Sequence, residues 1–430
     1  MAFKHYDVVR AASPSDLAER ITQKLKEGWQ PYGSALISTA GYGAEFIQPV
    51  VSEGSISSPE EPGNRPTTSA PSVAPEYYYV IALAGQSNGM SYGEGLPLPD
   101  TFDSPDPRIK QLARRSTVTP GGAACIYNDI IPADHCLHDV EDMTGLNHPK
   151  ADLSKGQYGC VGQGLHIAKK LLPFIPANAG ILLVPCCRGG SAFTTGTDGT
   201  YSDTTGASES STRWGVGRPL YKDLIGRTKA ALAKNPKNVL LAVVWMQGEF
   251  DFNGTPANHA ARFTEVVDQY RADLADMAGQ CVGGSADSVP WICGDTTYFW
   301  KQKNETAYQT VYGSYKNKTE KNIHFVPFMT DENGVNVPTN KPEEDPDIPD
   351  IGYYGSKWRT DRSTWTSQDR ASHFSSWARR GIISDRLATA ILSCAGKSSA
   401  FVNGTAGVVV PDRPVTTSES VIFYDAKKAS

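Results

Sequence analysis

A serine follows directly after a long apolar run in the middle of the chain. The run from Tyr78 to Ala84 leads into Gly85-Gln86-Ser87-Asn88-Gly89, so Ser87 stands at the carboxyl end of a predicted strand. Parallel sheets form their sites at this edge. A serine hydroxyl is a weak nucleophile until a base removes its proton, so Ser87 predicts catalysis only together with a histidine and oxyanion donors.

Two later strand ends carry candidate oxyanion donors. The first is the turn PCCRGGS, where the backbone N–H of Gly189 or Gly190 can approach a developing oxyanion because no side chain obstructs it. The second is WMQGEFD, where Gln247 offers a side-chain amide. An ordinary tight turn is the alternative for the glycines. Asp251 and Glu249 orient neighbours or bind substrate hydroxyls, and a structural hydrogen bond is as probable for Glu249 as substrate contact.

His373 is the best candidate for the base. It ends the segment SQDRASH and is the only histidine placed late enough to return over the sheet. An imidazole with an ordinary pKa of about 6.5 can take a proton and then return it near neutral pH. Ser87 and His373 therefore predict acyl transfer through a serine ester.

The ordered blocks G-Q-S-N, P-x-x-x-G-G and W-x-Q-G-E-x-D with a late histidine resemble those of SGNH hydrolases, over residues 77–398. Gln in place of Asn in the third block is similar to the branch of sialate O-acetylesterases and plant-type carbohydrate esterases. A closer likeness is to phage-encoded NanS-type sialate O-acetylesterases. It implies removal of the 9-O-acetyl group of N-acetylneuraminic acid by the residues that match Ser87, Gly189 or Gly190, Gln247 and His373.

One position of the Ser-His-Asp catalytic triad, the aspartate, does not match this resemblance. Most of the superfamily has an aspartate three residues before the histidine, where this chain has Arg370. We therefore predict a dyad of Ser87 and His373 in which a backbone carbonyl, that of Ala371, holds the second ring nitrogen. Asp369 is the less favoured orienter. An intact oxyanion hole sustains catalysis when the third member contributes little.

Further residues are candidates for substrate contact. Gln86, Asn88 and Glu249 adjoin the reacting groups. Arg188 is a candidate for pairing with the carboxylate of a sialic acid, as are Arg213 and Arg218, although a surface arginine is the slightly preferred interpretation of each. The polar stretch with Asp134, His135, Cys136 and His138 is interpreted as a solvated loop, because no second ligand pair accompanies it. We expect no metal and no other cofactor.

The order of elements predicts a three-layer α/β/α, flavodoxin-like SGNH domain with a mostly parallel five-stranded sheet at residues 77–398. A small α+β domain at 1–51 and a disordered Ser/Pro-rich linker at 52–76 precede it. Residues 399–430 form a tail or the start of a further β domain, with strands at 407–411 and 420–424. The expected strands are 6–9, 35–38, 45–51, 78–84, 181–185, 239–245, 289–293 and 323–328, and the expected helices are 13–27, 160–172, 220–234, 257–277, 305–315 and 373–394.

The composition of the chain limits the kinds of molecule that it is expected to bind. The 430 residues carry a net charge of -5 without a basic block, which argues against nucleic acid, and no apolar run is long enough to cross a bilayer. The first ten residues lack the pattern of a secretory signal, so we expect cytoplasmic synthesis with possible release by cell or phage lysis. The 8 cysteines form no CxxC pair and are expected to be mostly buried, reduced thiols.

Two other functions remain open from the sequence. An acetylxylan esterase or a deacetylase of a surface polysaccharide would use the same mechanism on another sugar. A non-catalytic glycan-binding protein with an esterase fold is the alternative outside the enzymes, and the presence of Ser87, Gln247 and His373 speaks against it. The expected partner is O-acetylated sialic acid or a sialoglycan.

Overall fold

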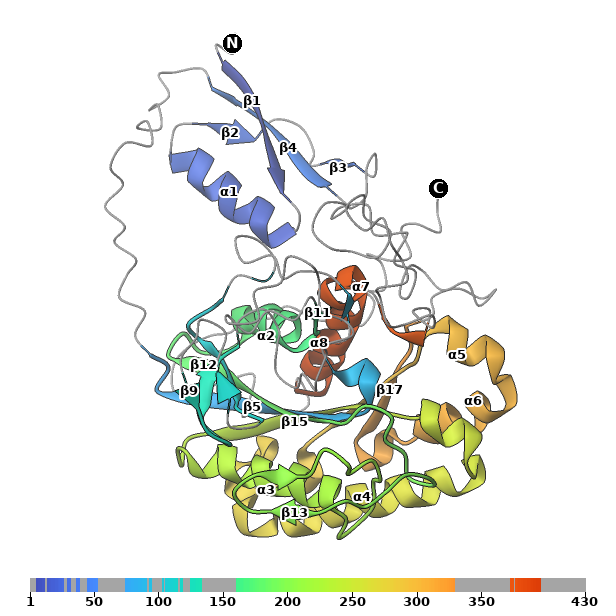
Figure 1. The fold of residues 1–430 in the computed structure, drawn as a ribbon. Helices are drawn as coiled ribbons and strands as arrows, with labels where there is room; N and C mark the ends of the chain where they lie inside the picture. Colours follow the sequence, from blue (N-terminus) through green and yellow to red (C-terminus); the bar gives the residue numbers. More distant parts are fainter. Residues whose placement is uncertain are drawn as a thin grey trace. The chain divides into compact units, whose positions relative to one another are not determined.

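The chain divides into two compact units, residues 1–72 and 73–430 (Figure 1). The computed structural model describes residues 5–11, 14–26, 29–31, 36–38, 45–52, 74–90, 93–94, 103, 105–114, 117–118, 124–133, 160–328, 372–374 and 376–395. Most of the expected linker at 52–76 lies outside these residues, since only 52 and 74–76 of it are described. The loop with Asp134 and His138 and the expected tail strands at 407–411 and 420–424 also lie outside them.

The first unit is a small antiparallel sheet with one helix. Strand β4 (Glu45–Ser52) pairs with β1 (His5–Ala11), β2 (Gln30–Pro31) and β3 (Leu36–Ser38). Helix α1 (Pro14–Lys26) begins with proline, whose fixed φ suits the first helical position. Among the described residues of this unit, the buried hydrophobic side chains are Val9, Leu17, Trp29 and Val50, with Ile21 packed against them.

The second unit is built on a seven-stranded sheet in the order β10-β7-β12-β5-β15-β16-β17. All neighbours pair in parallel except β10, which runs antiparallel to β7 at one edge. The strands are β5 (Tyr77–Gly85), β7 (Ile109–Leu112), β10 (Ile130–Pro132), β12 (Ala179–Cys187), β15 (Val239–Met246), β16 (Trp291–Gly294) and β17 (Ile323–Val326).

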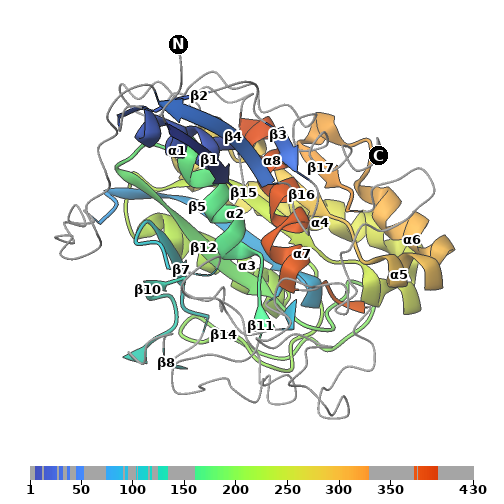
Figure 2. The same cartoon turned by 90° about the horizontal axis from the view of Figure 1, so that it is seen from above.

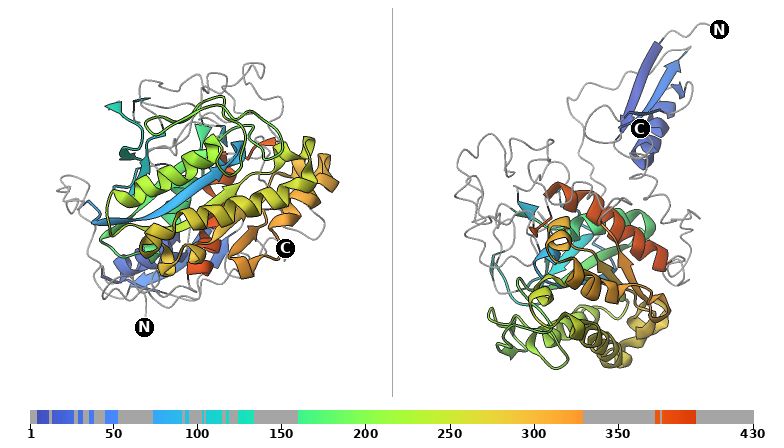
Figure 3. Two further views of the ribbon diagram at one scale, coloured as in Figure 1. Left: turned by 90° about the horizontal axis from the view of Figure 1, so that it is seen from below. Right: turned by 90° about the vertical axis from the view of Figure 1, so that its right-hand side faces the viewer.

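Helices cover both faces of this sheet. On one face lie α2 (Gly164–Leu171), α7 (Ser376–Arg380) and α8 (Ile382–Ala395), as Figure 2 shows. On the other lie α3 (Pro219–Ala233) and α4 (His259–Asp273), which cross the sheet in the left view of Figure 3. Every residue of β12 is buried, as expected for a parallel strand covered on both sides.

Short elements complete the second unit. Helices α5 (Tyr298–Lys303) and α6 (Glu305–Val311) lie between β16 and β17 in the sequence. Three pairs of two-residue strands lie outside the main sheet. Strand β6 (Gly93–Glu94) pairs with β11 (Cys160–Val161), β8 (Thr117–Val118) with β9 (Ala124–Cys125), and β13 (Tyr201–Ser202) with β14 (Gly206–Ala207). No helix among the described residues is both long enough and apolar enough to span a membrane.

The three-layer α/β class predicted from the sequence is confirmed, but the predicted sheet of five strands was too small, because the sheet has seven. All five expected strands are present with ends within two residues of the predicted ones. Strands β7 and β10 escaped prediction because they are short and lie toward one edge, and β7 contains two polar residues in its sequence IKQL. The expected burial of cysteines holds for Cys125, Cys186, Cys187, Cys281 and Cys293.

The prediction of a single last helix at 373–394 was also wrong. The helical part begins at Ser376 and is split at Gly381 into α7 and α8. The hydroxyl of Ser384 donates to the carbonyl of Arg379, which competes with regular helical hydrogen bonding at the break. His373 therefore lies in a bend before the helix.

A buried ion pair ties α7 to the rest of the domain. Asp103 accepts two hydrogen bonds from Nε of Arg380, at 3.1 and 3.2 Å, and one from Nη2 at 2.5 Å. His166 of α2 contacts the same carboxylate at 2.8 Å. Burial alone would raise the pKa of Asp103, but Arg380 and His166 hold it well below its usual range.

We expect Asp103→Ala to lower the free energy of unfolding by about 3–5 kcal/mol, because it leaves the Arg380 guanidinium buried without its carboxylate. Denaturant unfolding followed by tryptophan fluorescence measures the change. Lys229→Ala removes the exposed ion pair with Asp276 and is expected to cost less than about 1 kcal/mol. Equal effects of the two variants would contradict the prediction.

Candidate active site

Three strand ends meet at one edge of the sheet. Gly85, the last residue of β5, pairs with Cys187 of β12 on one side and with Met246 of β15 on the other. The segments that follow these strands carry Ser87, the two glycines and Gln247. The parallel register therefore gathers the predicted blocks at the carboxyl edge.

The turn that presents Ser87 requires glycine at its start. Gly85 has φ +128°, and a Cβ there would lie 2.1 Å from the carbonyl oxygen of Met246. The N–H of Gln86 donates to that same carbonyl at 2.8 Å. The chain then turns into a short 3₁₀ helix, Ser87–Gly89, whose first residue is the predicted nucleophile.

The structure brings Ser87 and His373 together although 286 positions separate them. Oγ of Ser87 lies 3.0 Å from Nε2 of His373. The other ring nitrogen, Nδ1, lies 3.0 Å from Oγ of Ser372. When Nε2 accepts the serine proton, Nδ1 carries the ring proton and donates it to Ser372. Ala371 and Asp369, the two orienters considered from the sequence, lie outside the described residues.

The surroundings of His373 favour its neutral form. Burial, and secondarily the positive charge of Arg379, lower the pKa of His373 from its ordinary value of 6.5 to about 3. A neutral imidazole has a free lone pair on Nε2 at neutral pH. His373 is thus in the protonation state that a base for Ser87 needs.

The glycine turn, residues 188–191 after β12, carries backbone N–H groups at the same end of the sheet as Ser87. The N–H groups of Gly189 and Gly190 donate to no other residue in the described part of the chain. Gly190 has φ +64°, a conformation that favours glycine. The turn is fixed against β5, because the N–H of Arg188 and the hydroxyl of Ser191 both donate to the carbonyl of Gly85, at 3.0 and 3.1 Å.

The side chain of Gln247 is engaged with protein groups. Its Nε2 donates to Oδ2 of Asp251 at 2.8 Å and to the carbonyl of Ser191 at 3.3 Å. Rotating the amide by half a turn would set its oxygen against both acceptors, so this orientation is well defined. Donation to an oxyanion, the role predicted from the sequence, requires one of these hydrogens to be released.

Asp251 organises the segments around Gln247. It accepts hydrogen bonds from the N–H groups of Phe193 and Thr194, the hydroxyl of Thr194 and Nδ1 of His259 at 2.9 Å. Burial alone would raise the pKa of Asp251, but His259 and the other donors lower it to about 2. The carboxylate therefore stays charged and joins the glycine turn to the third block.

Three residues predicted to contact substrate bind protein groups in the structure. Gln86, Asn88 and Glu249 are buried, with at most 2% of each exposed. Oε1 of Gln86 accepts from the N–H of Gly248 at 3.2 Å, and Asn88 donates to Glu249 at 2.8 Å. These side chains hold protein segments in place, because their polar atoms point at protein partners.

Arg188 is not the surface arginine that was the preferred interpretation. Only 2% of its surface is exposed, and its guanidinium pairs with Glu209 at 2.9 Å. It also donates to the carbonyl of Ala207. These partners tie the segment after β12 to the following loop, so the structure gives Arg188 a structural contact in place of a free charge. Arg218 pairs with Asp198, while Arg213 is partly exposed.

Phe250 was overlooked in the sequence. Its side chain is 42% exposed, and a Cβ on Gly190 would lie 3.4 Å from its ring. Its N–H donates to Oε1 of Gln86 at 3.4 Å. An aromatic residue between Glu249 and Asp251, immediately beyond the third strand end, was the available signal. The ring borders the predicted oxyanion turn.

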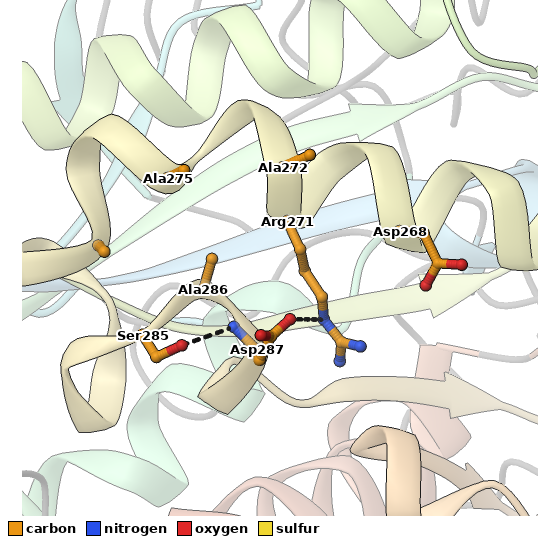
Figure 4. A pocket seen from close by; sticks show the side chains of 8 residues that line it. Asp268, Arg271, Ala272, Ala275, Ser285, Ala286 and Asp287 are labelled. Carbon is orange, nitrogen blue, oxygen red and sulfur yellow. Dashed lines mark hydrogen bonds and ion pairs between the residues drawn. The ribbon is translucent and has the colours of Figure 1, made fainter.

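A separate hollow of about 450 Å³ lies at the opposite edge of the sheet (Figure 4). Arg271 in its wall donates to the carbonyls of Lys321 and Val289, which precede β17 and β16. The amino ends of parallel strands are the edge away from Ser87. This hollow is therefore no part of the Ser87 site. The described residues contain no cluster of three potential metal ligands.

Comparisons with known proteins agree with this geometry. Residues 78–326 match the family model described as carbohydrate esterase, sialic acid-specific acetylesterase, and the chain belongs to that family. It is a carboxylic ester hydrolase. Residues 3–53 match a domain of unknown function, DUF1737.

The chain is similar to a protein of Escherichia coli (strain K12) named probable 9-O-acetyl-N-acetylneuraminic acid deacetylase. The two are 55% identical over 321 residues, which cover 74% of this chain and 97% of the relative. The crystal structure of NanS matches with a TM-score of 0.68 and 55% identity, over 74% of this chain and 98% of that one.

The depressed pKa of His373 predicts an unusual pH profile. Since the imidazole becomes protonated only below about pH 4, kcat/KM for an aryl acetate should stay nearly constant from pH 8 down to pH 5. A histidine with an ordinary pKa would lose about 97% of its neutral form by pH 5. Initial rates between pH 4 and 9 measure this, and an acid limb centred near pH 6.5 would contradict it.

Proposed function

We propose that the protein hydrolyses the 9-O-acetyl group of N-acetylneuraminic acid through an acetyl ester on Ser87. The observation that carries the proposal is the 3.0 Å contact between Oγ of Ser87 and Nε2 of His373. It occurs in a chain that is 55% identical to a protein named probable 9-O-acetyl-N-acetylneuraminic acid deacetylase. Family membership supports the substrate class.

The first half of the reaction forms the acetyl-serine. Oγ of Ser87 attacks the acetyl carbonyl carbon while Nε2 of His373 takes the hydroxyl proton. The carbonyl oxygen becomes an oxyanion, and we assign its stabilisation to the N–H groups of Gly189 and Gly190. The bond to the sugar oxygen then breaks, and the imidazolium returns its proton to that oxygen.

The second half repeats these steps with water. His373 takes a proton from a water molecule as its oxygen attacks the acetyl-serine. The tetrahedral intermediate uses the same oxyanion donors, and its collapse releases acetate while Ser87 recovers its proton. Gln247 contributes by holding the carbonyl of Ser191 at the end of the glycine turn, and direct donation by Gln247 stays a prediction.

The other functions that the sequence left open can be distinguished by testing which acetylated substrate is hydrolysed. A xylan or surface-polysaccharide deacetylase would share the acetyl-serine but prefer its own sugar. Acetate release from O-acetylated N-acetylneuraminic acid, acetylated xylan and an aryl acetate ranks the three. Preference for xylan would overturn the proposed substrate, and inertness toward every acetate would support a non-catalytic glycan-binding protein.

Ser87→Ala is expected to lower acetate release at least about 1000-fold, because the attacking oxygen is removed while the turn is kept. Acetate is measured with O-acetylated N-acetylneuraminic acid, and circular dichroism checks the fold. Ser288→Ala, just before β16 at the opposite edge, is the matched control and should keep full activity. A fully active Ser87→Ala would refute the nucleophile.

Phe250→Ala is expected to raise KM for O-acetylated N-acetylneuraminic acid about 3–10-fold while leaving an aryl acetate within twofold, because the exposed ring borders the glycine turn and offers apolar contact to the sugar. Ile126→Ala is the control, since Ile126 is 64% exposed and lies between β9 and β10. Equal losses on both acetates would argue against a contact with the sugar.

A further inference from the structure

We propose that Asn88 is a positioning residue that holds His373 against Ser87 by binding the backbone on both sides of the histidine. The inference rests on the proposed serine mechanism and adds to it. His373 lies in a bend within the described residues 372–374 and on no strand of the sheet, so sheet register does not set its position. Specific hydrogen bonds must do so.

The side chain of Asn88 forms hydrogen bonds with the two peptide groups that flank His373. Its Nδ2 donates to the carbonyl of Ser372 at 3.1 Å, and its Oδ1 accepts from the N–H of Phe374 at 3.2 Å. Asn88 is also the next residue after the nucleophile. One amide therefore links the segment of Ser87 directly to the segment of its base.

Glu249 fixes the orientation of that amide. Its Oε1 accepts from Nδ2 of Asn88 at 2.8 Å and from the hydroxyl of Thr296 at 2.7 Å. Because Nδ2 faces two oxygens, the flipped amide would place oxygen against oxygen and lose the donor to Ser372. Only 1% of Glu249 is exposed, so water does not replace this contact.

Two further side chains bind the same segments. Nε1 of Trp300 donates to the carbonyl of Ser372 at 3.0 Å. Arg379 donates through Nε to the carbonyl of Phe374 at 3.1 Å and through Nη1 to the carbonyls of Asn88 and Met90, at 3.1 and 2.6 Å. We call Asn88, Glu249, Trp300 and Arg379 the His373 clamp.

The clamp matters because proton transfer depends steeply on geometry. A displacement of about 1 Å in a reacting group costs about 100-fold in rate. Asn88→Ala should therefore lower kcat for an aryl acetate about 10–100-fold with KM within twofold. A contact to substrate would instead act mainly on KM. Asn88→Asp keeps an acceptor for Phe374 but sets a carboxylate against Glu249, and should lose kcat as well.

The matched control is another buried asparagine with the same kind of contacts. Oδ1 of Asn238 accepts from the N–H of Tyr78 at 2.8 Å, and its Nδ2 donates to the carbonyl of Ala231 at 2.8 Å. Asn238 precedes β15 and meets the start of β5, at the edge away from Ser87. Asn238→Ala should lower the melting temperature without lowering kcat.

The decisive experiment repeats Asn88→Ala in a His373→Ala background, with an activated aryl acetate to reveal residual turnover. If Asn88 acts through His373, the second substitution adds less than a twofold loss. A full additional 10–100-fold loss, or an unchanged kcat in the single variant, would overturn the proposal. Retained activity of His373→Ala itself would instead refute the proposed mechanism, so the two failures are distinguishable.

Trp300→Phe provides a second variant if Asn88→Ala does not fold. It removes one of the two donors to the carbonyl of Ser372 and keeps an aromatic ring. A loss of about 3-fold or more in kcat, abolished in the His373→Ala background, would support the clamp. An unchanged kcat would count against it.

Discussion

The close approach of β5 to β15 at Gly85 is the constraint on which the site depends. A side chain at this position would overlap the Met246 carbonyl, and that carbonyl also accepts from the next residue of the nucleophile turn. On the other side, the Gly85 carbonyl accepts from Arg188 and Ser191. One peptide thus fixes the nucleophile turn, the glycine turn and the third block relative to each other.

Polar groups inside the domain extend this constraint. Asp251 joins the glycine turn to the third block, and Arg379 joins the nucleophile turn to the segment of the base. Buried charges of this kind are costly unless their hydrogen bonds are made, so each favours a single arrangement of the segments around it. The order of the site comes from these networks as much as from the apolar core.

The sequence was informative where local pattern decides the outcome. Long apolar runs predicted the central strands, and the residues just after them predicted which groups share an edge. Patterns could not predict that Asn88 and Glu249 face protein, because the two side chains bind each other across 161 positions and Asn88 also binds Ser372, 284 positions away. Arg188 was misjudged for a different reason: its partners Ala207 and Glu209 lie only 19 and 21 positions away, but its burial depends on how that following loop folds. Ser372 as partner of the ring nitrogen has no sequence signature.

The distance in sequence between the nucleophile and its base has a consequence for biosynthesis. Ser87 and the start of the sheet leave the ribosome long before His373, and α8, which packs on the sheet, follows later still. At 5–20 residues per second, translation of the intervening chain takes about 15–60 s. During that time the nascent chain has a serine without its base, so esterase activity arises only when the carboxyl-terminal helices dock.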